Sequence, residues 1–356
     1  MARDHGFHAL RVREVVTETA DAATFVLDIP DELRDLFRYQ SGQFCTFRAS
    51  VGGETLMRCY SMASAPEVDD ELYVTVKRVP GGAVSNWMID NLHAGDEVDV
   101  TAPAGVFTLQ PDAHVVAFAG GSGITPVISV VKTALAATDR SVRLLYANRD
   151  RESVIFDDVL RALDDAHDRL ELVHHLDAES GYLASDDITG YVDASGDSQY
   201  YVCGPTPFMD LVEGALLDAG VAADHIHLER FGANVPVPTT DVADGGAGGT
   251  GGDDAAEPHD AATDEITVTI EIGGKSETTT WHAGTTILQT GRQLGLSPPS
   301  SCESGSCATC MAKCTEGTVK MYVNDALTED EVEEGWILTC QSIPTSPTVH
   351  VVYEDY

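Results

Sequence analysis

The sequence predicts a multidomain protein that combines an antiparallel β-barrel, a parallel-sheet α/β domain and a small α+β domain. The chain has 356 residues, which is more than one ordinary hydrophobic core accommodates. Its apolar pattern changes near residue 112 from short alternating runs to alternating strands and helices. A stretch almost without large apolar side chains, residues 239–264, then separates a C-terminal segment. We therefore expect domains over residues 1–112, 113–238 and 265–356.

Residues 1–112 contain short alternating runs that Gly, Pro and Asp separate, which is typical of an antiparallel sheet or barrel. The runs are HALRVREVV, TFVLDI, FCTFRAS, ELYVTVKRV and DEVDVTA.

Residues 113–238 alternate apolar strands with helical stretches, which is the pattern of a parallel α/β sheet. HVVAFAG precedes ITPVISVVKTALAA, SVRLLYAN precedes FDDVLRALDDAH, LELVHHL follows, and QYYVCG precedes PTPFMDLVEGALLDAG.

Residues 239–264 hold six Gly, six Ala and seven acidic residues, but no Lys or Arg. Such a segment cannot bury a core, so we expect a flexible linker. Beyond it, EITVTIEIG and SETTTWHA predict a hairpin, TILQTGRQLG a short helix, and WILTCQS and TVHVVY late strands.

The net charge is −37, with acidic residues in every part of the chain, which argues against nucleic acid or an anionic membrane as a partner. The basic residues comprise 16 Arg and 5 Lys. A uniformly acidic, Lys-poor surface predicts a halophilic source, and an acidic protein of an ordinary cytoplasm is the alternative. No apolar run is long enough to span a bilayer, and the N-terminus lacks the apolar stretch of a signal peptide. We expect a cytoplasmic protein without membrane insertion.

Three cysteines lie close together in CESGSCATC. Four residues separate Cys302 from Cys307, two separate Cys307 from Cys310, and Cys340 lies farther along the chain. This is the plant-type [2Fe–2S] spacing, and the small residues between the cysteines let backbone N–H groups approach the sulfurs of a cluster. Zinc is one alternative, although zinc sites usually pair two CxxC knuckles. A redox CxxC is the other, and it leaves Cys302 and Cys340 unexplained.

Residues 265–356 resemble plant-type ferredoxins. The resemblance runs from the hairpin and the helix through the cysteine loop to the acidic helix LTEDEVEEG and to LTCQS around the fourth cysteine. It implies an α+β (β-grasp) ferredoxin domain in which the four spaced cysteines bind the cluster. Cys314 is expected to pack as a small hydrophobe on the strand after the loop.

RCYSMAS, residues 58–64, resembles the Arg-x-Tyr-Ser motif of the ferredoxin–NADP reductase superfamily. The resemblance implies that Arg58 binds the flavin diphosphate, that Tyr60 packs on the isoalloxazine and that Ser61 forms a hydrogen bond near flavin N5. These residue types suit the chemistry, since a guanidinium binds phosphate and an aromatic ring stacks on a flat one. Taken alone, the stretch fits any polar strand.

GGAVSNWM, residues 81–88, is a glycine-rich turn that enters a helix and presents N–H groups to a diphosphate. A plain turn capped by Ser85 is the alternative. Superfamily members carry Gly-Gly-x-x-Ser here, which implies flavin-phosphate contacts from Gly82, Val84 and Ser85 and a backbone contact from Val76. FAD is favoured over FMN because most relatives with this arrangement use FAD.

Two further turns predict a nicotinamide nucleotide site. GGSGITP follows the strand HVVAFA and places backbone amides and a positive helix end at a pyrophosphate, although it is not GxGxxG. It matches the Gly-Gly-x-Gly-Ile-Thr-Pro of the reductase superfamily, and YVCGPTPFM matches its Cys-Gly-Pro signature. The residues so assigned to the nucleotide are Gly120, Gly121, Gly123, Thr125, Pro126, Cys203, Gly204 and Pro205.

The stretch YANRDRESVIF bears on the choice between NADH and NADPH. Arg149, Arg151 and Ser153 suit the 2′-phosphate of NADPH, whereas Asp150 and Glu152 suit a 2′-hydroxyl and repel that phosphate. The preference stays open.

Three side chains are expected at the reacting centre. The resemblance places Ser61 and Cys203 there, and it places Phe231 of HLERFGA over the flavin. A buried strand cysteine and a core phenylalanine at a strand end are the alternatives for the last two.

The domain order resembles the reductase components of multicomponent oxygenases, such as the phenylacetyl-CoA oxygenase and 3-ketosteroid hydroxylase reductases. The resemblance implies an NAD(P)H-dependent oxidoreductase that passes electrons from NADH or NADPH through FAD and a [2Fe–2S] cluster to a protein acceptor, an oxygenase component. A reductase of another redox protein, such as a hybrid-cluster protein, is one alternative. A redox-sensing iron–sulfur module without turnover is another, and the complete nicotinamide site argues against it.

Overall fold

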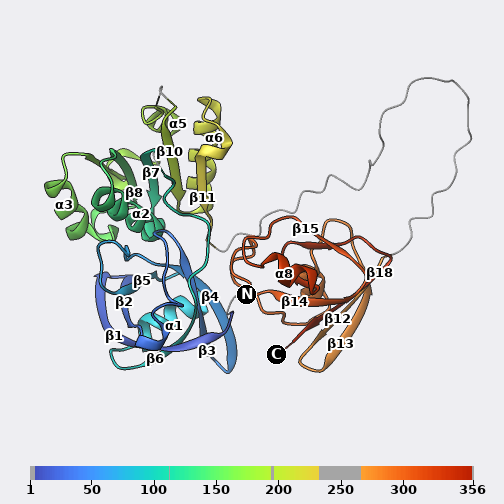
Figure 1. Ribbon diagram of the computed structural model, residues 1–356. Helices are drawn as coiled ribbons and strands as arrows, with labels where there is room; N and C mark the ends of the chain where they lie inside the picture. The colour runs from blue at the N-terminus through green and yellow to red at the C-terminus, as the bar shows by residue number, and fades with distance from the viewer. Residues whose placement is uncertain (1–4, 112, 194–195, 232–265, 355–356) are drawn as a thin grey trace, which may run out of the picture. The chain divides into compact units, whose positions relative to one another are not determined.

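The computed structural model describes residues 5–111, 113–193, 196–231 and 266–354 (Figure 1). The chain divides into two compact units, of which one spans Asp4–Ala233 and the other contains Asn234–Tyr356. The expected linker, residues 239–264, lies outside the described residues.

The first unit begins with a six-stranded antiparallel sheet in the order β4-β3-β6-β1-β2-β5. A bridge between Met62, directly after β4, and Val74 in β5 joins the two ends of this order, so the sheet closes towards the predicted barrel. Helix α1 covers its core with Val84 and Met88. The elements are β1 (Phe7–Thr19), β2 (Ala22–Asp28), β3 (Phe44–Val51), β4 (Glu54–Ser61), β5 (Leu72–Lys77), α1 (Ala83–Asn91) and β6 (Glu97–Thr101), with a 3-10 turn η1 (Asp31–Leu33).

A five-stranded parallel sheet in the order β11-β10-β7-β8-β9 completes this unit. Helices α2 and α3 pack on one face of the sheet, and α5 and α6 pack on the other. Because both faces are covered, β7 reads as a continuous apolar run. The elements are β7 (His114–Gly120), η2 (Gly121–Gly123), α2 (Ile124–Ala137), β8 (Val142–Asn148), η3 (Arg151–Ser153), α3 (Asp157–Ala166), β9 (Leu170–Leu176), α4 (Asp177–Ser180), α5 (Ser185–Thr189), β10 (Ser198–Cys203), α6 (Thr206–Asp218), η4 (Ala223–His225) and β11 (Ile226–Glu229).

The C-terminal unit contains a mixed five-stranded sheet, ordered β13-β12-β18-β14-β16, and a small ladder of β15 and β17. The predicted hairpin is β12 with β13, and β12 also pairs in parallel with β18. The elements are β12 (Thr267–Ile272), β13 (Lys275–Thr280), α7 (Ile287–Gln293), β14 (Met311–Glu316), β15 (Val319–Met321), α8 (Glu329–Glu333), β16 (Trp336–Leu338), β17 (Ser342–Pro344) and β18 (Thr348–Tyr353).

One expectation for this unit is corrected. WILTCQS was expected to form one strand, but the structure breaks it into β16 and the start of β17, with Cys340 in the turn between them. A continuous strand would point successive side chains to opposite faces of the sheet, whereas a turn can direct the thiol at the cysteine loop.

Candidate functional site

The cysteine loop lies between α7 and β14 and has an unusual backbone. Glu303 and Ala308 adopt positive φ angles of 54° each, and Gly305 has a φ of 89°. Non-glycine residues in this region are strained, and such strain is concentrated at functional sites. The curled backbone directs amides at sulfur: Cys302 N–H donates to Cys307 Sγ (3.5 Å) and Ser304 N–H donates to Cys302 Sγ (3.4 Å).

The four spaced cysteines form two pairs. In the first pair, the hydrogen bond between Cys302 and Cys307 raises the pKa of the Cys302 thiol, and burial raises it further. In the second pair, the hydrogen bond between Cys310 and Cys340, together with burial, raises the pKa of the Cys310 thiol. Two pairs suit a cluster with two irons, each held by two thiolates. The donor set therefore fits a [2Fe–2S] cluster.

Hydrogen bonds tie the loop to the turn that carries Cys340. Thr339 donates twice to the Cys310 carbonyl, from its N–H (3.2 Å) and from its hydroxyl (2.9 Å), and Gln341 Nε2 donates to the Glu303 carbonyl (2.8 Å). Cys314 lies on β14, half-buried, and its thiol donates to the Glu316 carbonyl (3.5 Å).

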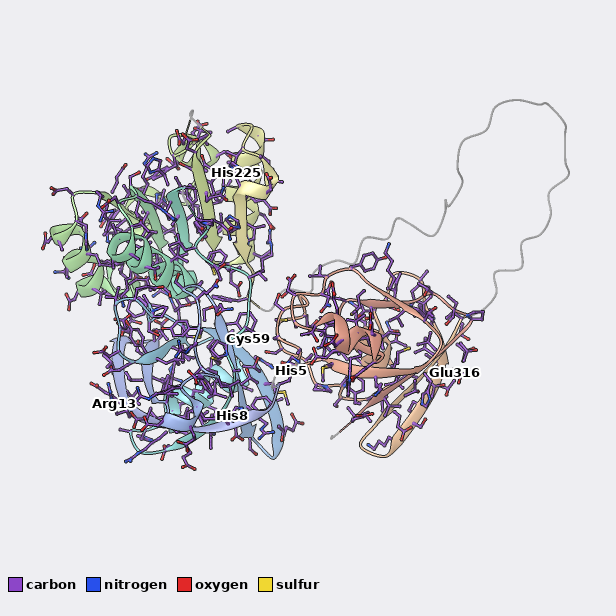
Figure 2. The ribbon with its side chains drawn as sticks, in the orientation of Figure 1. His5, His8, Arg13, Cys59, His225 and Glu316 are labelled. Atoms are coloured by element: carbon purple, nitrogen blue, oxygen red, sulfur yellow. The ribbon has the colours of Figure 1, made fainter. Side chains whose placement is uncertain are left out.

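Strand β4 ends with the predicted flavin motif. Arg58 is exposed, and Tyr60 packs edge-on against Phe47 with 5.5 Å between the ring centroids. Cys59, the residue after Arg58 in the sequence, is labelled in Figure 2. The hydroxyl of Ser61 is buried and has no hydrogen-bond partner among the described residues. An unsatisfied buried hydroxyl is costly, so this atom fits a ligand that forms a hydrogen bond with it, as a flavin does.

The first turn of α1 has no side-chain cap for its backbone N–H groups. Gly82 is the N-cap. Ser85 Oγ instead accepts a hydrogen bond from Val79 N–H (3.2 Å). A Cβ on Gly82 would lie 2.7 Å from that hydroxyl and 2.9 Å from Val79 Cβ, so a side chain here would force these neighbours to move. The uncapped backbone N–H groups are thus available to a diphosphate.

Val84 and Val76 have fully buried side chains in the barrel core. Any contact of these two residues with the flavin must therefore come from their backbone groups.

The turns after β7 and β10 touch each other at the expected nicotinamide site. A Cβ on Gly123 would lie 2.1 Å from the Cys203 carbonyl oxygen, and one on Gly204 would lie 2.7 Å from Phe208 Cδ1. A Cβ on Gly120 would lie 3.0 Å from Pro205 Cδ. The glycines thus allow the turns to pack where the strand order reverses, which is where open α/β sheets bind nucleotides.

The other residues of these turns stabilise them. Gly121 has a φ of 53°, and its carbonyl accepts a hydrogen bond from Tyr146 (3.0 Å). Thr125 is buried and donates to the Ser122 carbonyl (3.0 Å), and Pro126 is buried in the first turn of α2. Cys203 is fully buried, and burial raises the pKa of its thiol, so it stays protonated.

The two arginines expected to bind the 2′-phosphate of NADPH form ion pairs with carboxylates. Arg149 is about three-quarters exposed and donates to Asp150 (2.6 Å), and Arg151 lies 3.6 Å from Asp157. Ser153 is buried in a capping box with Asp150, donating its hydroxyl to the Asp150 carbonyl (2.8 Å). A 2′-phosphate would have to compete with Asp150 for Arg149.

One polar group escaped the sequence analysis. Asn148 ends β8, and the oxygen of its buried side-chain amide has no hydrogen-bond partner in the described part of the chain. The signal was its position, because polar residues at the carboxyl ends of parallel strands line nucleotide sites.

Phe231 is 40% exposed and follows β11. Its neighbour Arg230 is anchored to α6 through Asp210 (2.8 Å) and Glu213 (2.6 Å).

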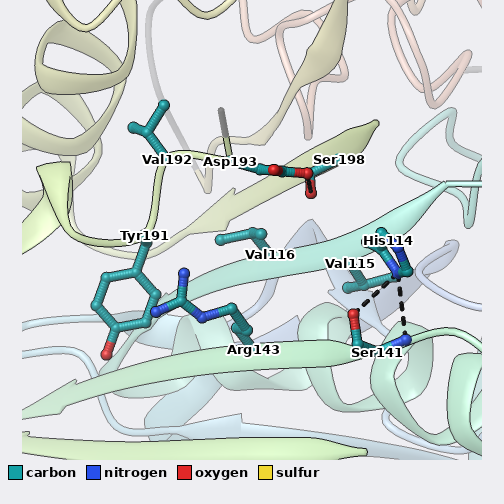
Figure 3. A pocket seen from close by; sticks show the side chains of 9 residues that line it. All are labelled: His114, Val115, Val116, Ser141, Arg143, Tyr191, Val192, Asp193 and Ser198. Carbon is teal, nitrogen blue, oxygen red and sulfur yellow. Dashed lines mark hydrogen bonds between the residues drawn. The ribbon is translucent and has the colours of Figure 1, made fainter. Parts of the chain in front are cut away.

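A separate pocket opens at the opposite edge of the parallel sheet (Figure 3). It is lined by the starts of β7, β8 and β10, whereas the nucleotide turns lie at the ends of those strands. Arg143 there lies over the Tyr191 ring (4.5 Å) and donates to Glu171 (2.8 Å). This pocket is not the nucleotide site.

Comparison with known proteins identifies the three kinds of domain. An oxidoreductase FAD-binding domain matches residues 9–109, an oxidoreductase NAD-binding domain matches residues 118–214, and a 2Fe-2S iron-sulfur cluster binding domain matches residues 270–345. These matches define the class of the protein as a flavin- and nicotinamide-dependent oxidoreductase with its own iron–sulfur domain.

Several relatives match this chain over nearly its whole length. The ferredoxin reductase component of 3-ketosteroid-9-alpha-monooxygenase from Rhodococcus rhodochrous is 38% identical over 97% of this chain and 96% of its own. The glycine betaine monooxygenase reductase subunit from Pseudomonas aeruginosa is 32% identical over 97% of this chain and 95% of its own. The structure of phthalate dioxygenase reductase matches with a TM-score of 0.60 at 26% identity, over 98% of both chains.

The chain belongs to this family of reductases, which join FAD-binding, NAD-binding and 2Fe–2S domains in one polypeptide. It is an NAD(P)H-dependent oxidoreductase that uses FAD and a [2Fe–2S] cluster, as predicted. Among the described residues, no helix has the length and apolar character needed to cross a bilayer.

Proposed function

We propose that the chain is the reductase component of an oxygenase system and delivers electrons from NAD(P)H to the oxygenase component. The observation that carries the proposal is the match over nearly the whole length to reductases of two different oxygenase systems. A cytoplasmic location, where NAD(P)H is produced, belongs to the same proposal.

When bound, FAD would supply an acceptor for hydride and a donor of single electrons, and the [2Fe–2S] cluster would supply a one-electron carrier. The residues of the chain bind and orient these groups. Arg58 and the first turn of α1 hold the flavin diphosphate, Tyr60 packs on the flavin ring, and the Ser61 hydroxyl forms a hydrogen bond at its reacting edge. Backbone amides of Gly120–Gly123 hold the nicotinamide nucleotide, and the buried, protonated Cys203 excludes water beside it.

The four paired cysteines hold the cluster. Replacing Cys340 with Ala should abolish the visible absorbance of the cluster, because each pair supplies both thiolates of one iron. FAD content and ferricyanide reduction should persist, whereas cytochrome c reduction should fall. Cys314→Ala is the matched control and should keep the cluster. Loss of the cluster with Cys314→Ala but not with Cys340→Ala would refute the ligand assignment.

The acceptor is tested separately. NADH or NADPH is mixed with the protein and an oxygenase component purified from the same organism, and bleaching of the oxygenase iron absorbance is recorded. Reduction that requires the intact cluster supports the proposal. Oxygenase components that stay oxidised while cytochrome c is reduced would contradict it.

A further inference from the structure

Helix α2 carries a polar stripe that is buried against the flavin domain. Ser129, Lys132 and Thr133 recur at helical spacing and are each less than 7% exposed. Lysine is almost never buried to this extent unless it is paired. The neighbouring apolar residues of α2 pack on the parallel sheet, so this stripe requires another explanation.

The hydrogen-bond partners of the Lys132 ammonium belong to the flavin domain. Its Nζ donates to Asp69 Oδ2 (2.5 Å) and to the Tyr73 hydroxyl (2.6 Å). Tyr73 donates to the same Asp69 oxygen (3.3 Å), which also accepts from Ala65 N–H (2.7 Å). Burial, together with Asp69, raises the pKa of Tyr73, so its hydroxyl remains a neutral donor.

The other two residues of the stripe bind the same segment. Ser129 donates to the Ser64 carbonyl (2.6 Å) and accepts from Gly42 N–H (3.3 Å). Thr133 donates to Glu67 (2.7 Å). The stripe thus grips the segment from Ser64 to Tyr73, which begins three residues after Ser61.

This contact joins the two halves of the reacting centre. On one side, the gripped segment directly continues the flavin motif. On the other, α2 begins directly after Gly123, and Lys132 lies about 14 Å along the helix from that glycine at the usual rise per residue. Moving α2 against Asp69 would therefore move the nicotinamide turn against Ser61.

We propose that the Lys132–Asp69 pair sets the position of the nicotinamide turn relative to the flavin motif, which makes Lys132 a positioning residue for hydride transfer. A buried ion pair adds little net stability, because desolvation offsets the attraction, but an unpaired buried charge is strongly unfavourable. The pair thus disfavours every docking of the two domains except the one in which the charges meet. The proposal rests on the flavin and nicotinamide placements given above and is independent of the electron acceptor.

The test is a double-mutant cycle on the holoprotein with Lys132→Met, Asp69→Asn and the double variant. Lys132→Met leaves the partly buried Asp69 carboxylate without its cation, so it should lower both the melting temperature and the rate of flavin reduction. The double variant removes both charges and should recover the melting temperature. Because the specific docking is still lost, its flavin reduction by NAD(P)H should stay at least about tenfold slower than wild type at equal FAD content.

The second measurement does not depend on turnover. A non-reducing tetrahydro analogue of NADH is titrated into the oxidised holoprotein, and the long-wavelength absorbance of stacked nicotinamide and flavin rings is recorded. This band should weaken in the double variant. Arg143→Met is the matched control, because it breaks the Arg143–Glu171 pair inside the nucleotide domain, and it should leave rate and band unchanged.

The double variant distinguishes a role of the Lys132–Asp69 pair in positioning the two domains from a role in stability alone. A double variant that regains stability but keeps slow reduction and a weak band supports the proposal. A double variant with wild-type rate and band would overturn it. Flavin lost from every variant of the cycle but not from Arg143→Met would also overturn it, since the pair would then hold the flavin site itself.

Discussion

Ser61 shows at the scale of one residue how a binding site differs from a folding core. Its hydroxyl is buried at the end of β4 without a partner among the described residues, whereas the nearby Ser64 hydroxyl accepts hydrogen bonds from Tyr39 (2.7 Å) and Tyr73 N–H (3.1 Å). Both serines lie in RCYSMAS, and the resemblance to the Arg-x-Tyr-Ser motif assigns only Ser61 to the flavin. The unsatisfied one is the one assigned to the flavin.

Ser61→Ala should therefore slow flavin reduction without destabilising the apoprotein. Removing a buried hydroxyl that lacks a partner relieves a cost of ~1–3 kcal/mol, so the melting temperature of the apoprotein should stay equal or rise. The measurements are thermal unfolding of the apoprotein and stopped-flow flavin reduction of the holoprotein. A clear loss of apoprotein stability would show that Ser61 is satisfied within the fold.

Glu18 gives a pH-dependent prediction. It lies on β1, accepts from Thr24 (2.6 Å), and its pKa is raised, with burial as the main cause. A raised folded-state pKa means that its contribution to stability is full below the unfolded pKa, near 4.3, and is lost as pH rises through the folded value.

Glu18→Gln keeps the acceptor but carries no charge. Its melting temperature should exceed that of wild type at pH 7.5, and the difference should shrink as pH falls towards 4.5. If the difference in melting temperature between Glu18→Gln and wild type did not change with pH, the raised pKa of Glu18 would be contradicted.

At the scale of elements, the glycines of the nucleotide site act through packing between turns. The sequence predicts backbone amides for a pyrophosphate, and the structure adds that the turns after β7 and β10 approach too closely for any side chain. The strand–helix alternation predicted both elements because apolar periodicity is local. Their contact joins Gly123 to Cys203 across eighty residues, and no local pattern encodes it.

Gly123→Ala should disrupt this contact. The added Cβ would lie 2.1 Å from the Cys203 carbonyl oxygen, so the turns must separate, at a cost of about 2 kcal/mol or more. Nucleotide affinity, measured by calorimetry with NAD⁺ and NADP⁺, and the melting temperature should both fall. Gly190→Ala is the control, since a Cβ there meets nothing within 4 Å. Equal effects of the two substitutions would contradict the packing argument.

At the scale of the whole molecule, one chain combines domains that accept two electrons from NAD(P)H with a ferredoxin domain that carries one electron at a time. The flavin and nicotinamide domains form one compact unit, and the ferredoxin domain belongs to another. The linker prediction and the halophilic source both stay predictions. The acidity is spread along the whole chain, so high salt should screen the self-repulsion of each unit.

Residues 1–238 should therefore fold alone, bind FAD and pass electrons from NAD(P)H to ferricyanide. Ferricyanide accepts directly from flavin, whereas cytochrome c should be reduced poorly because the cluster is missing. Both rates are compared with the full chain at matched flavin content and high salt. Equal cytochrome c rates would disprove that electrons must leave through the cluster.

The sequence by itself predicted the three domains and the spacing of the cluster cysteines, because turns, strand periodicity and ligand spacing depend on neighbouring residues. Its resemblance to the reductase superfamily implied FAD and the nicotinamide nucleotide. Only the tertiary structure decided which groups meet across long separations. It pairs Cys310 with Cys340, occupies Ser153 with Asp150, leaves Ser61 unsatisfied and seats Lys132 on Asp69. These contacts form only when helices and strands that are far apart in the sequence pack together. Packing then decides which polar groups are buried and which charges meet, and no local sequence pattern specifies this.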